Sequence, residues 1–178
     1  MRTASTQKLT LCALCCALLC VCSQLQIPLP PVPLSLSLLA VHLAGALLGS
    51  RAGSASVAAY VLLGAAGVPV FAGFAGGVSV LLGPTGGFLA GYMLCAWLVG
   101  RLTERLGLSR RSLLLSMAAG TLACYALGTA WFMLVTNTNL VGSLTVCVLP
   151  FIPGDLIKTF LSALLVRRLQ KPLHAMGL

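Results

Sequence analysis

An acidic and a basic residue stand three positions apart in the stretch FIPGDLIK, where Asp155 is one of only two acidic residues in the sequence and Lys158 follows it. On a helix this i, i+3 spacing places both side chains on one face. A charge at the centre of a membrane helix costs about 2.5–3.5 kcal/mol, so ionisable residues there usually meet a partner or a ligand. A carboxylate that accepts N–H groups beside an ammonium suits a ligand with both hydrogen-bond donors and an acid group.

A simpler role for Asp155 is to cap a helix that starts near Pro153 and Gly154. A side-chain carboxylate at that place can accept backbone N–H groups of the first turn. A cap does not account for Lys158, because a cation near a helix N-terminus opposes the helix dipole. The sequence therefore favours a ligand site at this pair over a cap alone.

Glycines and aromatic residues gather in a second candidate segment, residues 83–92, GPTGGFLAGY. Phe88 and Tyr92 are one turn apart and form a single aromatic face, which suits either a ligand or ordinary helix packing. No lysine follows the glycines, so the segment is not a phosphate loop. Gly73, Gly76 and Gly77 do not complete a dinucleotide fingerprint either. No nucleotide or other cofactor is predicted.

Few residues of the sequence are suited to metal binding or catalysis. Five of its eight cysteines crowd residues 12–22, yet no histidine or carboxylate lies nearby, so they are predicted to be apolar packing residues and not zinc ligands. Asp155 has no second membrane carboxylate with which to form a dyad, and the histidines are His42 and His174. No catalytic residue is predicted, and an intramembrane enzyme is only an alternative.

The composition is that of an integral membrane protein: 59% of the 178 residues are hydrophobic and 7% are charged, with a mean hydropathy of +1.06. This length accommodates about six helices of roughly 20 residues each. The prediction is an all-α membrane domain over residues 1–178, with helices at about 7–25, 34–49, 53–67, 84–99, 112–135 and 153–169.

The formal charge of +9 is distributed along the chain in a way that indicates membrane topology. Apart from Lys158, basic residues fall at the start and in every second gap between apolar runs: Arg2, Lys8, Arg51, Arg101, Arg105, Arg110, Arg111, Arg167, Arg168 and Lys171. Under the positive-inside rule, this alternation predicts that both termini are cytoplasmic. It also argues against nucleic-acid binding, which requires the cations on one folded surface.

The uncharged, glycine-rich segment 67–83 is predicted to be a long outer loop that folds back over a pocket. Non-helical backbone at membrane depth is tolerated where it is buried in protein or lines a cavity.

Three segments together resemble the BioY family, the biotin-specific S components of energy-coupling factor transporters. They are PVPLSLSLLAV (31–41), VPVFAGFAGGVSVLLGPTGGFLAGY (68–92) and LPFIPGDLIK (149–158). The resemblance implies a six-helix S-component fold in the cytoplasmic membrane, high-affinity binding of biotin in an externally accessible pocket, and no enzymatic activity in this chain.

The resemblance also implies site residues and partners. The substrate-binding positions would be Phe71, Gly73, Thr85, Gly87, Phe88, Tyr92, Asp155 and Lys158. Ala13 and Ala17 fit a helix 1 motif that contacts a membrane coupling subunit (EcfT), which connects to two cytoplasmic ATP-binding cassette ATPases. Small residues four apart do permit close helix approach.

Two positions depart from the family pattern. Ser35-Leu36-Ser37 replaces a typical Thr-Leu-Gln, and Phe88 replaces a frequent tyrosine, so each change removes or shortens a polar group. The alternatives are an S component for another vitamin, one for a precursor such as dethiobiotin, an intramembrane enzyme, and a purely structural membrane subunit. Which end of biotin would meet Asp155 or Lys158 is left open.

Overall fold

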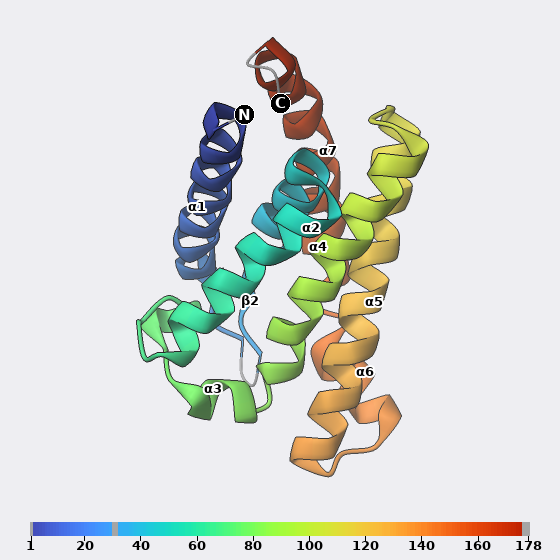
Figure 1. Cartoon of the computed structure of the whole chain (residues 1–178). Helices are drawn as coiled ribbons and strands as arrows, with labels where there is room; N and C mark the ends of the chain where they lie inside the picture. The colour runs from blue at the N-terminus through green and yellow to red at the C-terminus, as the bar shows by residue number, and fades with distance from the viewer. Residues whose placement is uncertain (1, 30–31, 176–178) are drawn as a thin grey trace.

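The computed structural model describes residues 2–29 and 32–175, and the side chains of 6–29 and 32–170. Pro30 and Pro31 of the proline-rich connection, and the side chains of Arg2, Lys171 and His174, lie outside this part. The described chain is a helical bundle (Figure 1). Its helices are α1 (Arg2–Gln24), α2 (Ser37–Ala65), α3 (Val78–Leu82), α4 (Gly86–Leu106), α5 (Arg110–Thr136), α6 (Leu140–Cys147) and α7 (Ile152–Ala175).

Short irregular elements occupy the end of the bundle opposite the termini (Figure 1). The strands β1 (Gln26–Ile27) and β2 (Leu34–Ser35) pair antiparallel across the connection between α1 and α2. The short 3₁₀ helix η1 (Ala72–Phe74) and helix α3 interrupt the predicted loop 67–83. The elements β2, η1 and α3 contribute Ser35, Ala72 and Val80 to the wall of a cavity at this end of the bundle.

Helix α2 is a helical hairpin with its apex at Gly49, where φ is +80°. A side chain at Gly53 would collide with the carbonyl oxygen of Ala44, which shows how closely the two halves approach. Figure 1 shows the second half returning alongside the first. Two helices separated by a turn around Arg51 were predicted. The turn is tighter, because one glycine in the left-handed region reverses the chain.

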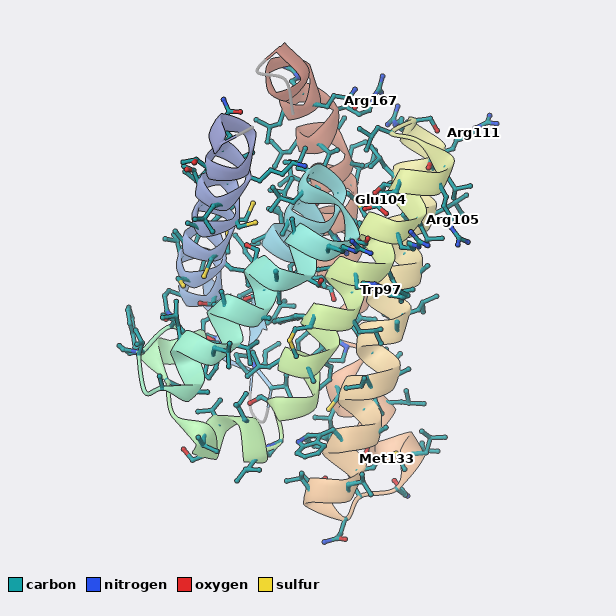
Figure 2. All side chains as sticks on the ribbon, viewed as in Figure 1. Trp97, Glu104, Arg105, Arg111, Met133 and Arg167 are labelled. Carbon is teal, nitrogen blue, oxygen red and sulfur yellow. The ribbon has the colours of Figure 1, made fainter. Side chains whose placement is uncertain are left out.

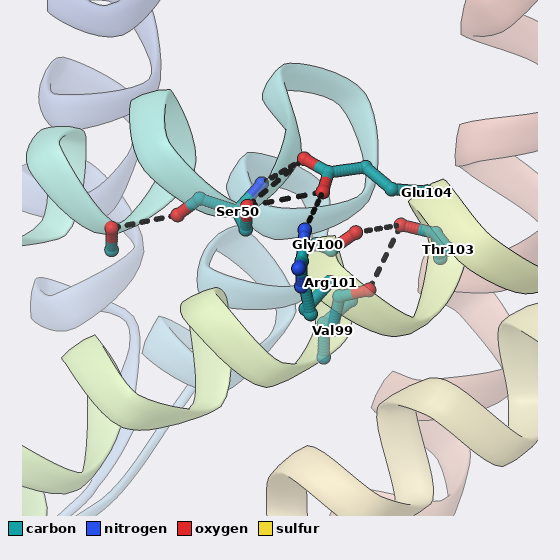
Figure 3. Close-up of polar contacts among 7 residues, drawn as sticks. Ser50, Val99, Gly100, Arg101, Thr103 and Glu104 are labelled. Atoms are coloured by element: carbon teal, nitrogen blue, oxygen red, sulfur yellow. Dashed lines mark hydrogen bonds and ion pairs between the residues drawn. The ribbon is translucent and has the colours of Figure 1, made fainter.

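Glu104, from the end of α4, fixes this apex (Figure 3). Its Oε1 accepts from the Ser50 backbone N–H at 2.7 Å, and the Ser50 hydroxyl donates to both carboxylate oxygens at 3.0 and 3.1 Å. Arg101 lies 3.7 Å from the same carboxylate. The second acidic residue of the sequence is therefore a cap for the returning half of α2, supplied by another helix.

Glu104→Ala is expected to lower the free energy of unfolding by about 1 kcal/mol, the usual cost of losing a helix cap. The apparent Tm in detergent should fall, while Arg105→Ala, at the next position of α4, which is also exposed, should leave it unchanged. Equal Tm values for the two variants would contradict the capping role.

Three helices of the described chain are long and apolar enough to cross a membrane: Thr6–Gln24, Ser37–Ala65 and Arg110–Thr136. Helices α6 and α7 form a further, broken span, bent by 52°. Because α2 reverses at Gly49, its two halves run in opposite directions through the bundle. Figure 2 places Arg105, Arg111 and Arg167 at the end where both termini lie in Figure 1, and Met133 at the other. By the positive-inside rule, the arginine end is cytoplasmic.

Three helix predictions need correction. Helix α4 continues to Leu106 instead of ending near residue 99, because a helix leaving the membrane can carry charges in water. It starts at Gly86, two residues after Pro84. The stretch between the predicted helices 112–135 and 153–169 contains α6, which Asn139 caps by accepting from the Gly142 N–H at 2.9 Å.

Candidate functional site

A cluster of three polar side chains lies where α5 meets the first turns of α7; Asp155 and Lys158 are buried, and Tyr125 is half-buried. The Lys158 ammonium donates to Asp155 Oδ1 at 2.7 Å, and the Tyr125 hydroxyl of α5 donates to Asp155 Oδ2 at 2.5 Å. Asp155 and Lys158 are each about 6% exposed. Both carboxylate oxygens therefore meet side chains from within the bundle, and not the backbone N–H groups that a cap would satisfy.

The cluster lines an inner cavity together with residues from four segments of the chain, 32–38, 88–92, 124–125 and 151–158. These are Val32, Pro33, Ser35, Leu38, Phe88, Tyr92, Cys124, Tyr125, Phe151, Asp155 and Lys158. Apolar groups dominate the wall, so the charged pair is the principal polar feature that a ligand would meet there. Burial weakens competition from water and strengthens such polar contacts.

An outer cavity adjoins the inner one and shares five lining residues with it: Val32, Pro33, Ser35, Phe88 and Tyr92. Its remaining lining comes from Ser37, Tyr60, Phe71, Ala72, Ala75, Val80, Thr85 and Leu89. The shared lining places the outer cavity, under the loop segment with Phe71 and Ala72, next to the inner cavity beside Asp155. A largely apolar pocket with a few convergent polar groups is typical of a small-molecule site.

Six of the eight residues predicted for the site line these cavities. Phe88 and Tyr92 line both, and their one-turn spacing on α4 turns them to the same side. Thr85 lines the outer cavity, as does Phe71, which is 2% exposed. The Phe71 ring packs edge-to-face on Tyr60, with 5.5 Å between ring centroids.

Gly73 and Gly87 line neither cavity. Gly87 faces α5, where a side chain on it would collide with Trp131. Trp131 also donates from its indole N–H to the carbonyl of Gly83 at 3.0 Å, so this glycine-rich segment packs tightly on α5. Gly73 has φ of +73° and permits the turn of η1.

The structure adds residues that the sequence analysis did not assign to the site. Tyr125 is the clearest, and a phenol within an apolar helix is a signal in itself, because its hydroxyl needs a partner. Ser35 and Ser37, noted earlier only as departures from a pattern, hydrogen-bond to each other at 2.9 Å beside the outer cavity. His42 of α2 lines neither cavity; it is buried, and its Nε2 lies 3.1 Å from the Thr121 hydroxyl of α5.

Ala13 and Ala17 lie away from the site, on the outward face of α1. Both are exposed, and Leu14 and Leu18 beside them are 63% and 37% exposed. The opposite face of α1 packs into the core through residues such as fully buried Leu19. The outward face of α1 is therefore open within this chain.

Comparisons with known proteins agree with this architecture. Residues 1–175 match the BioY family. The biotin transporter BioY of Thermotoga maritima is 43% identical over 155 residues, 87% of this chain and 90% of that protein. The probable biotin transporter BioY of Pyrococcus horikoshii is 37% identical over 164 residues, 92% of this chain and 96% of that protein.

A solved structure, the crystal structure of the S component for biotin from an ECF-type ABC transporter, superposes with a TM-score of 0.89 at 32% identity. The superposition covers 96% of this chain and 94% of the chain in that crystal structure. The resemblance seen in the sequence and the predicted all-α membrane S-component fold are both confirmed. The chain is a multi-pass membrane protein, and it belongs to the BioY family.

Proposed function

We propose that this protein binds biotin with high affinity in the two adjoining cavities and mediates its uptake across the cytoplasmic membrane. The observation that carries the proposal is the buried Asp155–Lys158 pair, joined by the half-buried Tyr125, in the wall of an aromatic-lined pocket. It is supported by family membership and by relatives that are biotin transporters.

The chemistry of biotin complements these residues. Its ureido ring offers N–H donors that suit the Asp155 carboxylate, and its valerate is an anion that suits the Lys158 ammonium. Because Asp155 and Lys158 are 2.7 Å apart, one end of biotin would meet the pair, and Phe88 and Tyr92, which line both cavities, offer apolar surface to the rest of the molecule. Binding would replace part of the internal Asp155–Lys158 contact with contacts to the ligand.

Transport requires energy that this binding site does not supply. The exposed face of α1 with Ala13 and Ala17 supports docking on a membrane coupling subunit of the EcfT type. Two cytoplasmic ATPases attached to that subunit would hydrolyse ATP, while the chain described here captures the substrate and carries no catalytic role.

A ligand screen by thermal shift on the purified chain tests the substrate. Biotin should raise the apparent Tm, since a ligand that binds only the folded state stabilises it by about 2.7 kcal/mol at 100 times its Kd. Dethiobiotin and other vitamins, at the same concentration, should raise it less. A larger shift with one of them would replace biotin as the proposed substrate, and turnover of a ligand without partner subunits would indicate an enzyme.

Tyr125→Phe is expected to weaken biotin binding by about 10- to 150-fold. The substitution removes the hydroxyl that donates to Asp155 Oδ2 and leaves the ring in place. A hydrogen bond to a charged group contributes about 1.5–3 kcal/mol, and 1.4 kcal/mol is a factor of ten. Calorimetry measures the change, and Thr145→Val, which removes an exposed hydroxyl of α6 that lines neither cavity, is the control. An unchanged Kd for Tyr125→Phe would remove Tyr125 from the proposed site.

A further inference from the structure

The outer end of α1 is tied to the loop that covers the outer cavity. The Ser23 hydroxyl donates to the carbonyl of Val70 at 2.5 Å. The Gln24 side-chain amide donates to the carbonyls of Val70 at 3.2 Å and Phe71 at 3.0 Å, and its oxygen accepts from the Phe74 N–H at 2.9 Å. Two adjacent side chains therefore make four hydrogen bonds to one short loop segment.

The segment that they hold forms part of the cavity wall. Phe71, Ala72 and Ala75 all line the outer cavity. The Phe71 ring fills the space above Gly64, where any larger side chain would collide with it. A ligand that enters or leaves by way of this wall must displace the segment.

The segment has few internal bonds of its own. Phe71 donates its N–H to the Ala75 carbonyl at 3.0 Å, and the turn between them includes φ values of +73° at Gly73 and +57° at Phe74. A non-glycine residue in the left-handed region carries a conformational cost. The position of the segment therefore depends on contacts from outside it, of which those from Ser23 and Gln24 are the most numerous hydrogen bonds.

The chemistry of Gln24 matches what this segment offers. One primary amide supplies donors for two carbonyls and an acceptor for one N–H, whereas glutamate would supply acceptors only and leucine neither. Gln24 does not line either cavity, so its effect on a ligand must pass through the loop.

We propose that Ser23 and Gln24 form a latch that holds the loop segment 70–75 closed over the bound ligand and so sets how long the ligand stays. The proposal rests on the proposed function, with biotin as the ligand. Gln24 is a positioning residue, and its kinetic signature differs from that of a residue that touches biotin. Loss of the latch should speed release, because the closed wall is less stable, while capture by the unchanged inner cavity should proceed at about the same rate.

The test follows dissociation of labelled biotin from the purified full chain after addition of excess unlabelled biotin. Gln24→Leu should release biotin at least about tenfold faster than the wild type, the factor expected from losing two to three hydrogen bonds. Its association rate constant should change less than about threefold. Gln7→Leu makes the same substitution at an exposed position near the other end of α1 and should release biotin at the wild-type rate.

A second variant helps to distinguish loss of the latch from misfolding of Gln24→Leu. Gln24→Glu keeps an acceptor for the Phe74 N–H but faces two carbonyl oxygens with a carboxylate, so its release should be at least as fast as that of Gln24→Leu. A simple loss of folded protein would lower the number of binding sites and leave the dissociation rate of the remaining sites unchanged. Wild-type dissociation rates in both variants would overturn the latch. Absence of biotin binding in the wild type would instead reject the proposed function, and the latch with it.

Discussion

Lys158→Met should weaken biotin binding by about 100- to 4,000-fold. Methionine preserves much of the length and apolar volume of the lysine stem, so the substitution chiefly removes the ammonium. Asp155 would then keep only Tyr125 as a partner in a site where it is about 6% exposed. Breaking a buried ion pair costs about 3–5 kcal/mol, and each 1.4 kcal/mol is tenfold in Kd.

The matched control is Lys8→Met, which removes an exposed lysine from the cytoplasmic end of α1. Its biotin affinity, measured by the same calorimetry, should equal that of the wild type. The double variant Asp155→Leu/Lys158→Met separates folding from recognition. Replacing both members of a buried pair by apolar residues is often nearly neutral for stability, so this protein should fold without binding biotin. Tight binding by Lys158→Met would place the ligand elsewhere.

Ala13→Trp should abolish energised biotin uptake by cells that contain the partner subunits, and leave the Kd for biotin unchanged. An indole at this exposed position would keep another helix from the close approach that small residues permit. The position is on the outward face of α1, whereas the ligand cavities are lined from the other elements of the bundle.

Ala118→Trp makes the same change at an exposed alanine of α5 and controls for bulk placed against lipid. Uptake by this variant should match the wild type when corrected for the amount of protein in the membrane. If Ala13→Trp lost uptake and biotin binding to the same degree, the effect would lie in folding and not in docking. Full uptake by Ala13→Trp would remove α1 from the proposed interface.

Local sequence was sufficient to find those site residues whose neighbours lie on the same helix. Asp155 with Lys158, and Phe88 with Tyr92, are each related by one turn, so helical periodicity alone places each pair on one face. Tyr125 was missed because its partner is 30 residues away in sequence and is met only when α5 packs against α7. Gly87 precedes Phe88, but adjacent positions on a helix differ by about 100° in direction, which turns Gly87 toward Trp131.

The fold predictions were correct for features set by the hydrophobicity of long segments, and less accurate for features set by single residues. The apolar runs located the main helices, because long uninterrupted runs have few alternatives in a membrane. They did not show that Gly49 would reverse α2 within one residue, which depends on a positive φ. The apolar run also predicted an end of α4 that is too early, since hydropathy shows which residues lie in the bilayer and not where the helix ends. Glu104 received no role, because its partner Ser50 lies on another helix.

Calorimetric titration of biotin into the purified wild-type chain, without partner subunits, tests the central claim most directly. The cluster of Asp155, Lys158 and Tyr125 and the cavities above it come from this chain alone. The expected result is saturable binding of one biotin per chain, with tight affinity in the absence of ATP. Titration without saturable heat, on protein shown to be folded, would contradict the assignment of this site to biotin.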